Sequence, residues 1–154
     1  MMNLAYPMVQ YPITDLRALP VQSMERYAAL VLRVAGADGL HDGEAAAFQF
    51  AIDHSLGQGL SLEKINEIAL QPVGEIIQNQ DVLRVLAPYV LRDAARVAQA
   101  DGELSDLELK GLRDSAEALG VSIARLDSII AAVQFDRKMR ICWTHALQSE
   151  GSKI

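Results

Sequence analysis

Seven acidic side chains gather at two short corners of the sequence and could together bind divalent metal ions. Each corner contains the tripeptide Ala-Asp-Gly: residues 33–44 are RVAGADGLHDGE and residues 96–108 are RVAQADGELSDLE. Carboxylate oxygens suit a hard cation such as Ca²⁺ or Mg²⁺, and His41 would let the first corner accept Zn²⁺. The candidate metal ligands are Asp38, Asp42, Glu44, Asp101, Glu103, Asp106 and Glu108.

The spacing of these carboxylates is not that of an EF-hand. A loop that began at Asp101 would place Asp106 where glycine is required and Leu112 where the bidentate glutamate belongs. A divalent cation therefore remains a candidate cofactor, but the EF-hand is not the loop that would bind it.

Helix capping explains some of the same residues without any ion. Ser105 and Glu108 have the spacing of a capping box, in which each side chain bonds the backbone of the other residue. Glu44 falls in the first turn of an expected helix, where acidic residues are favoured. Asp38 and Asp101 follow expected helix ends, where a negative charge is unfavourable and needs a backbone N–H, a nearby arginine or a cation to compensate it. Capping and cation binding both remain open.

The remaining residues with reactive side chains form no catalytic constellation. The three histidines are scattered, and no metalloprotease, Cys-pair or phosphate-loop motif occurs. Asp53 and His54 are neighbours, which on a helix point about 100° apart. Cys142 is the single cysteine, which excludes an internal disulfide, and Trp143 beside it is expected to anchor the core or an interface. We therefore predict a protein that is not an enzyme.

Composition and charge narrow the class further. Aromatic residues make up 5% of the chain, and Ala, Leu, Val and Ile dominate, which favours an all-α bundle. The net charge of −6 repels phosphate backbones, so nucleic acid is not an expected partner. No apolar run reaches 18 residues and the first residues lack a basic signal-peptide region. These features predict a cytoplasmic protein without a transmembrane segment.

The elements that must position the corners are helices with one apolar face. An arm with three prolines precedes a single domain over residues 21–148, and a tail follows over 149–154. Pro88 either kinks the long fifth segment or begins a new helix there. Helices are expected over residues 21–37, 42–56, 62–70, 73–78, 81–100, 105–119, 122–133 and 134–148.

The corners are part of a longer internal repeat. Asp38 and Leu56 align with Asp101 and Leu119 at one constant offset, and Ser61 and Ser122 each open a third helix. We therefore predict two three-helix units, about residues 22–70 and 84–133, packed as a pseudo-twofold pair, in a bundle of seven to eight helices.

The doubled corner resembles the TerB-like (tellurite-resistance protein B) family. The pattern is a helix that ends in Ala-Asp-Gly with a glutamate seven residues after the aspartate, in Val97 to Glu108 and more loosely in Val34 to Glu44. The resemblance covers about residues 22–133. In the first copy one residue is missing and Leu40-His41 replaces Glu103-Leu104-Ser105, which disturbs a symmetric pair of sites.

The resemblance implies a compact all-α fold whose acidic cluster is suspected of binding metal ions. It also implies an association with tellurite or stress resistance and with membrane-linked complexes, without catalytic activity. We therefore expect a scaffold or binding module with protein partners, and peripheral association with a membrane complex is one such role. The alternative is a structural or homodimerising module in which the corners are only helix caps. A metal-assisted hydrolase is a third, minor alternative.

Overall fold

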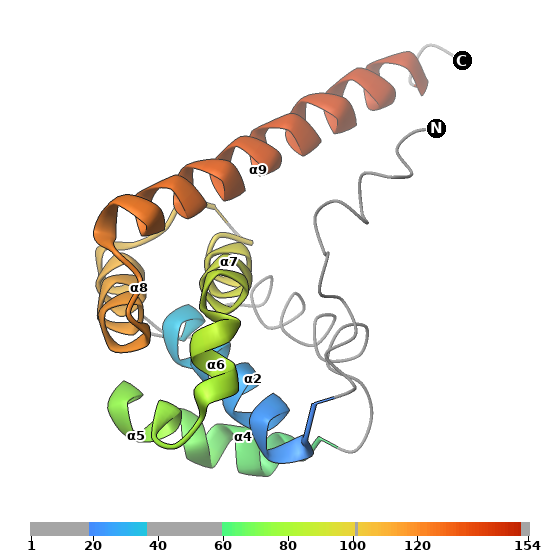
Figure 1. Cartoon of the computed structure of the whole chain (residues 1–154). Helices are drawn as coiled ribbons and strands as arrows, with labels where there is room; N and C mark the ends of the chain where they lie inside the picture. The colour runs from blue at the N-terminus through green and yellow to red at the C-terminus, as the bar shows by residue number, and fades with distance from the viewer. Residues whose placement is uncertain (1–18, 37–59, 101, 152–154) are drawn as a thin grey trace.

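The described part of the chain consists of helices joined by short turns. A computed structural model of the protein describes residues 19–36, 60–100 and 102–151, and these residues contain no strand (Figure 1). The all-α prediction is confirmed. The described helices are α2 (Val21–Ala35), α4 (Leu62–Ala69), α5 (Val73–Ile77), α6 (Asp81–Val85), α7 (Ala87–Ala98), α8 (Asp106–Leu119) and α9 (Ile123–Gly151).

The helix α2 lies at the centre of this body. It contacts α4, α7 and α8, and ten of its 15 residues are buried. Tyr27, Leu30, Val31 and Val34 recur at helical spacing and are all buried, as their periodicity predicts. Burial of so many side chains on a single helix makes α2 the element around which the others are arranged.

Local sequence signals set several helix ends. Ser61 caps α4 by accepting a hydrogen bond from the N–H of Lys64 at 3.2 Å. Pro88 occupies the first turn of α7, so the long segment expected over 81–100 is two helices, with Leu86 between them. Gly120 ends α8 with a positive φ of 80°, a conformation that glycine adopts without strain.

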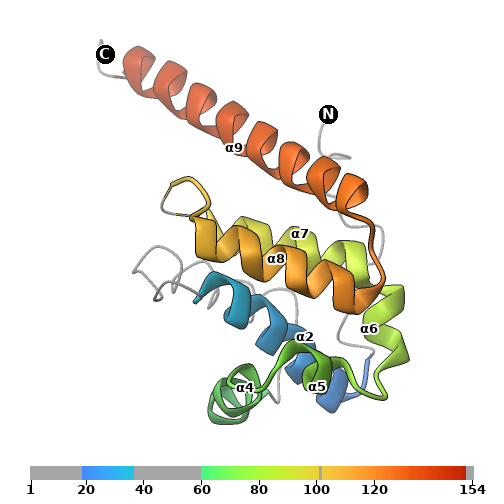
Figure 2. The ribbon, with the colours of Figure 1, turned by 90° about the vertical axis from the view of Figure 1, so that its left-hand side faces the viewer.

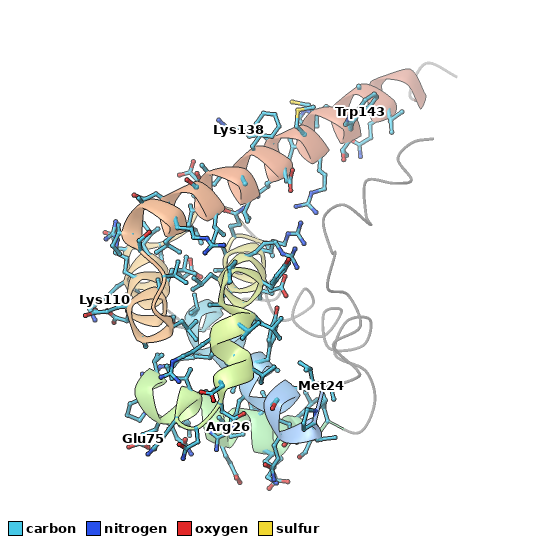
Figure 3. All side chains as sticks on the ribbon, viewed as in Figure 1. Met24, Arg26, Glu75, Lys110, Lys138 and Trp143 are labelled. Carbon is cyan, nitrogen blue, oxygen red and sulfur yellow. The ribbon has the colours of Figure 1, made fainter. Side chains whose placement is uncertain are left out.

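Two arginines of α2 cap the helices that follow it in the fold. Arg26 Nη1 donates to the carbonyl oxygens of Glu75 and Ile76 at 3.1 and 2.7 Å, at the end of α5 (Figure 3). Arg33 Nη1 donates to the carbonyl of Ala69, the last residue of α4, at 2.9 Å. Neither α4 nor α5 has a basic residue in its own last turn, so α2 supplies the cations that their carboxyl ends favour.

The C-terminal helix α9 is one continuous helix of 29 residues. The sequence predicted a break between residues 133 and 134, and that prediction is wrong, because neither glycine nor proline interrupts the segment. The first half of α9 lies across α7 and α8, and the second half extends beyond them (Figure 2). Trp143 is 62% exposed, so it is not a core residue.

The internal duplication stays a prediction. The helices that would correspond, α2 and α7, pack side by side and each ends just before its Ala-Asp-Gly corner. The expected counterpart of α8, residues 42–56, lies outside the described residues, as do residues 1–18 of the N-terminal arm. The boundaries of the domain and of the repeat units are likewise untested, although α9 continues past residue 148 to Gly151.

Candidate functional site

The second acidic corner joins α7 to α8. The N–H of Gln99 donates to the carbonyl of Ala95 at 3.1 Å, and the N–H of Gly102 donates to the carbonyl of Gln99 at 3.2 Å, so the chain turns tightly after α7. Beyond the turn, the side chains of Glu103 and Asp106 are exposed to solvent. These two carboxylates are therefore accessible to an ion.

Glu108 does not share that exposure. Its Oε1 accepts a hydrogen bond from the N–H of Ser105 at 2.8 Å, and its own N–H donates to Ser105 Oγ at 3.1 Å. This is the capping box that the sequence predicts, and it buries the Glu108 side chain to 2% exposure. Glu108 has a defined role in starting α8, whatever else the corner does.

The candidate ligands are thus only partly placed. Among the described residues, no three histidine, cysteine, aspartate or glutamate side chains lie close enough to hold a metal ion. Asp101 of the second corner and the whole first corner, with Asp38, Asp42 and Glu44, lie outside the described residues. The ligand set therefore stays a prediction from sequence.

Arg33 and Arg96 precede the two corners in the sequence and could have compensated the charges of Asp38 and Asp101. Both arginines have partners elsewhere in the fold. Arg33 donates to the end of α4, as described above. Arg96 Nη2 lies 3.7 Å from Asp136 Oδ2, which links α7 to α9. Both arginines therefore bind neighbouring helices to the body.

A small cavity adjoins the second corner. It has a volume of about 350 Å³ and lies between the turn at Gly102 and Glu103 and one side of α9, where Arg137 and Lys138 line it. The side chain of Gln99 also lines it and is only 3% exposed, with no hydrogen-bond partner for Nε2 among the described residues. The corner is thus bordered by a cationic segment of α9.

A larger groove of about 840 Å³ lies between α2, α4 and α8. Apolar side chains line it together with acidic residues of α4, and buried Ser115 contributes a hydroxyl with no hydrogen-bond partner in the described segments. Sequence reasoning missed this groove because it is built from three separated helices. One residue marks the groove locally: Leu70, which directly follows the end of α4, is apolar but 84% exposed.

Comparison with known proteins identifies the fold. A solved structure of a tellurite resistance protein from Nostoc punctiforme is similar to this chain, with a TM-score of 0.63 and 21% sequence identity over 96% of each chain. This similarity shows a shared fold over nearly the whole length. No family model matches the sequence, and no curated protein does either. Within the described ranges, no helix is both long and apolar enough to cross a bilayer.

Proposed function

Because the chain has the fold of a tellurite resistance protein, we propose that it is a non-enzymatic, TerB-like scaffold or binding protein associated with tellurite or stress resistance. The observation that carries the proposal is this similarity over 96% of both chains, together with the doubled Ala-Asp-Gly corner of the sequence. In this proposal the protein is cytoplasmic and acts by binding partners.

The acidic corners are proposed to bind a divalent cation. In the second corner Glu103 and Asp106 are exposed and follow Asp101 closely in the chain, so these three can supply oxygen ligands. Glu108 fixes the start of α8 and so positions the corner. Asp38, Asp42 and Glu44 are the corresponding ligands in the first corner.

Calorimetric titration of chelator-treated protein with Ca²⁺, Mg²⁺ and Zn²⁺, with thermal unfolding in parallel, tests the cation. Binding to the folded state should raise the melting temperature. The variant Asp101→Asn with Asp106→Asn should abolish that rise. A matched control, Glu117→Gln with Asp127→Asn, removes two exposed charges away from the corner and should leave it intact. No heat and no rise with any of the three ions would refute the cation site.

A structural module is the second candidate, and the capping box favours it. The reciprocal bonds between Ser105 and Glu108 account for the positions of these two residues in the second corner without any ion. In that case the corners only start helices, and the protein works by self-association. Sedimentation over a range of protein concentrations tests this candidate, because a strict monomer at every concentration would oppose it.

A further inference from the structure

An exposed apolar stripe begins near the middle of α9 and continues along its second half. We call four residues of this helix the α9 stripe: Phe135, Met139, Trp143 and Leu147. They follow one another at intervals of four and are all exposed. The interval of four keeps neighbouring members on one side of a helix. The stripe therefore presents large apolar side chains to solvent.

Phe135, the first member of the α9 stripe, lines the small cavity at the second corner, whereas Met139, Trp143 and Leu147 line neither of the cavities described above. Leu126 and Val133, seven residues apart on α9, are buried against the other helices. Phe135 follows Val133 by two positions, which places it about 200° further around the helix axis. Beyond Phe135 the extension thus offers a face that no other described helix covers.

Basic side chains border the stripe on both sides. Lys138 precedes Met139 and Arg140 follows it, so each lies about 100° from Met139 around the axis. Neither forms an ion pair with any described residue. Between residues 137 and 148 the sequence has three basic residues and no acidic one, whereas the whole chain carries a net charge of −6. An acidic, apolar surface is the chemical complement of this segment.

The groove between α2, α4 and α8 is such a surface. Leu32, Leu70, Val73 and Leu107 give it apolar walls, and Leu70 is 84% exposed. These side chains can receive the large apolar residues of a helix, as in helix-in-groove recognition.

The charges at the groove edge have the opposite sign to those of α9. Glu63 and Glu67, one helical turn apart on α4, have no ion-pair partner in the described segments and leave that edge negative. The groove's own Lys110 pairs with Asp114 at 2.9 Å, and Arg33 keeps its positive charge while it donates to Ala69, so the charged lining residues sum to −1. Ser115 adds a buried hydroxyl without a partner among the described residues. The stripe and the groove therefore match in polarity and in charge.

We propose that the α9 stripe of one molecule docks into the groove between α2, α4 and α8 of a second copy of this chain. Lys110 at the groove and Trp143 on the stripe lie on opposite sides of the molecule (Figure 3), so α9, a continuous helix, does not reach its own groove. A membrane surface is the less favoured occupant, because anionic lipid recognition typically uses four to eight basic residues and this segment has three. The contact is independent of any cation at the corners, so a failed ion titration leaves it untouched.

The single tryptophan makes the contact measurable in the full chain. Trp143 emission should shift to the blue as protein concentration rises, in step with a rising sedimentation-average mass, because docking removes the indole from water. Added salt should weaken both changes, since the exposed charges are screened. A mass that never exceeds the monomer, or an emission shift that appears only with anionic phosphatidylglycerol vesicles, would overturn the proposal.

Complementation between two variants tests the pairing of stripe with groove. The stripe variant, Met139→Ala with Trp143→Ala, keeps its groove and contains no tryptophan. The groove variant, Glu67→Lys with Leu70→Lys, changes exposed residues only and keeps its stripe. Each alone should self-associate about tenfold or more weakly than the natural chain. Mixed together, they should form a one-to-one dimer in which Trp143 of the groove variant shifts to the blue.

Two exposed apolar residues outside both surfaces provide controls. Ile141→Ala lies on another side of α9, and Val85→Lys lies on α6, so both variants should associate as the natural chain does. Self-association of the groove variant at full strength would indicate that α9 pairs with α9 and would refute the docking. A mixture that remains monomeric would refute it equally.

Discussion

The hydroxyl of Tyr27 on α2 donates a 2.6 Å hydrogen bond to Asp93 Oδ2 on α7. The other carboxylate oxygen of Asp93 accepts from Arg92 Nε at 3.2 Å, and the Arg92 guanidinium lies over the ring of Tyr89 at 5.1 Å from its centroid. A polar link thus ties together two helices that also pack through buried apolar side chains. Burial of the phenol, reinforced by the negative charge of Asp93 and by this hydrogen bond, raises the pKa of Tyr27 well above its usual value.

Removal of this one hydroxyl should destabilise the fold. Tyr27→Phe keeps the buried ring but takes the donor from Asp93, so we expect the free energy of unfolding to fall by about 1 to 2 kcal/mol. Urea denaturation measures the change. Tyr89→Phe is the matched control: it keeps the ring beneath Arg92, and its hydroxyl makes no hydrogen bond with a described residue, so its effect should be a few tenths of a kcal/mol. Equal losses in the two variants would contradict the assignment.

The raised pKa of Tyr27 predicts a loss of stability in alkaline solution. The unfolded chain loses the phenolic proton near pH 10, whereas the folded chain retains it, so the folded state binds more protons above that pH. The contribution is fully present below pH 10 and declines as the pH rises further, by up to about 1.4 kcal/mol per pH unit. The difference in unfolding free energy between the natural chain and Tyr27→Phe isolates this effect, and a difference that stays constant up to pH 11 would refute it.

Glu108 allows the hydrogen bonds of the capping box to be tested separately from the negative charge of the side chain. Glutamine can replace glutamate in a capping box, so Glu108→Gln retains the bond to the Ser105 N–H and should cost less than about 1 kcal/mol. Ser105→Ala removes the other half of the box and should cost about 1 kcal/mol. Thermal unfolding in the presence of a chelator compares the two. If Glu108→Gln were the more damaging substitution, the negative charge itself would be required at the start of α8.

Two glycines of α8 should respond in opposite directions to alanine. A Cβ at Gly111 would meet Val34 of α2 at 3.7 Å or more, an ordinary contact, so Gly111→Ala should stabilise the protein by about 0.5 to 1 kcal/mol through helix propensity. Gly120 has a φ of 80°, so Gly120→Ala should cost about 1 kcal/mol. Denaturant unfolding of both variants checks the pair. Destabilisation by Gly111→Ala would contradict an ordinary contact between the added methyl group and Val34.

Sequence patterns predicted most of the described helices because local signals carry them. Ser61, Ser105 and Gly120 begin or end helices through bonds and torsions within a few residues, and such signals can be recognised without the fold. The false break in α9 has a physical origin. Its apolar side chains move from the face of Leu126 and Val133 to the face of Phe135, and a change of face within one helix resembles the start of another.

The candidate site was less predictable because its parts come from distant segments. The capping role of Glu108 follows from spacing alone and was foreseen. The groove, by contrast, needs α2, α4 and α8 to be placed together, and no periodicity within one of them indicates it. The exposure of Trp143 excludes the core and leaves the other expected role, an interface anchor; the sequence could not decide between them, since a tryptophan at helical spacing fits a buried face as well as an exposed one.

The arginine caps supplied by α2 link the stability of α4 and α5 to tertiary assembly. The helices α4 and α5 have eight and five residues, which is below the about 12 to 15 that an isolated helix needs for marginal stability in water. Arg26 and Arg33 reach their carboxyl ends only once α2 lies beside them. A synthetic peptide of residues 60–80 should therefore show a coil spectrum by circular dichroism. These two helices are therefore stable only within the tertiary assembly that includes α2.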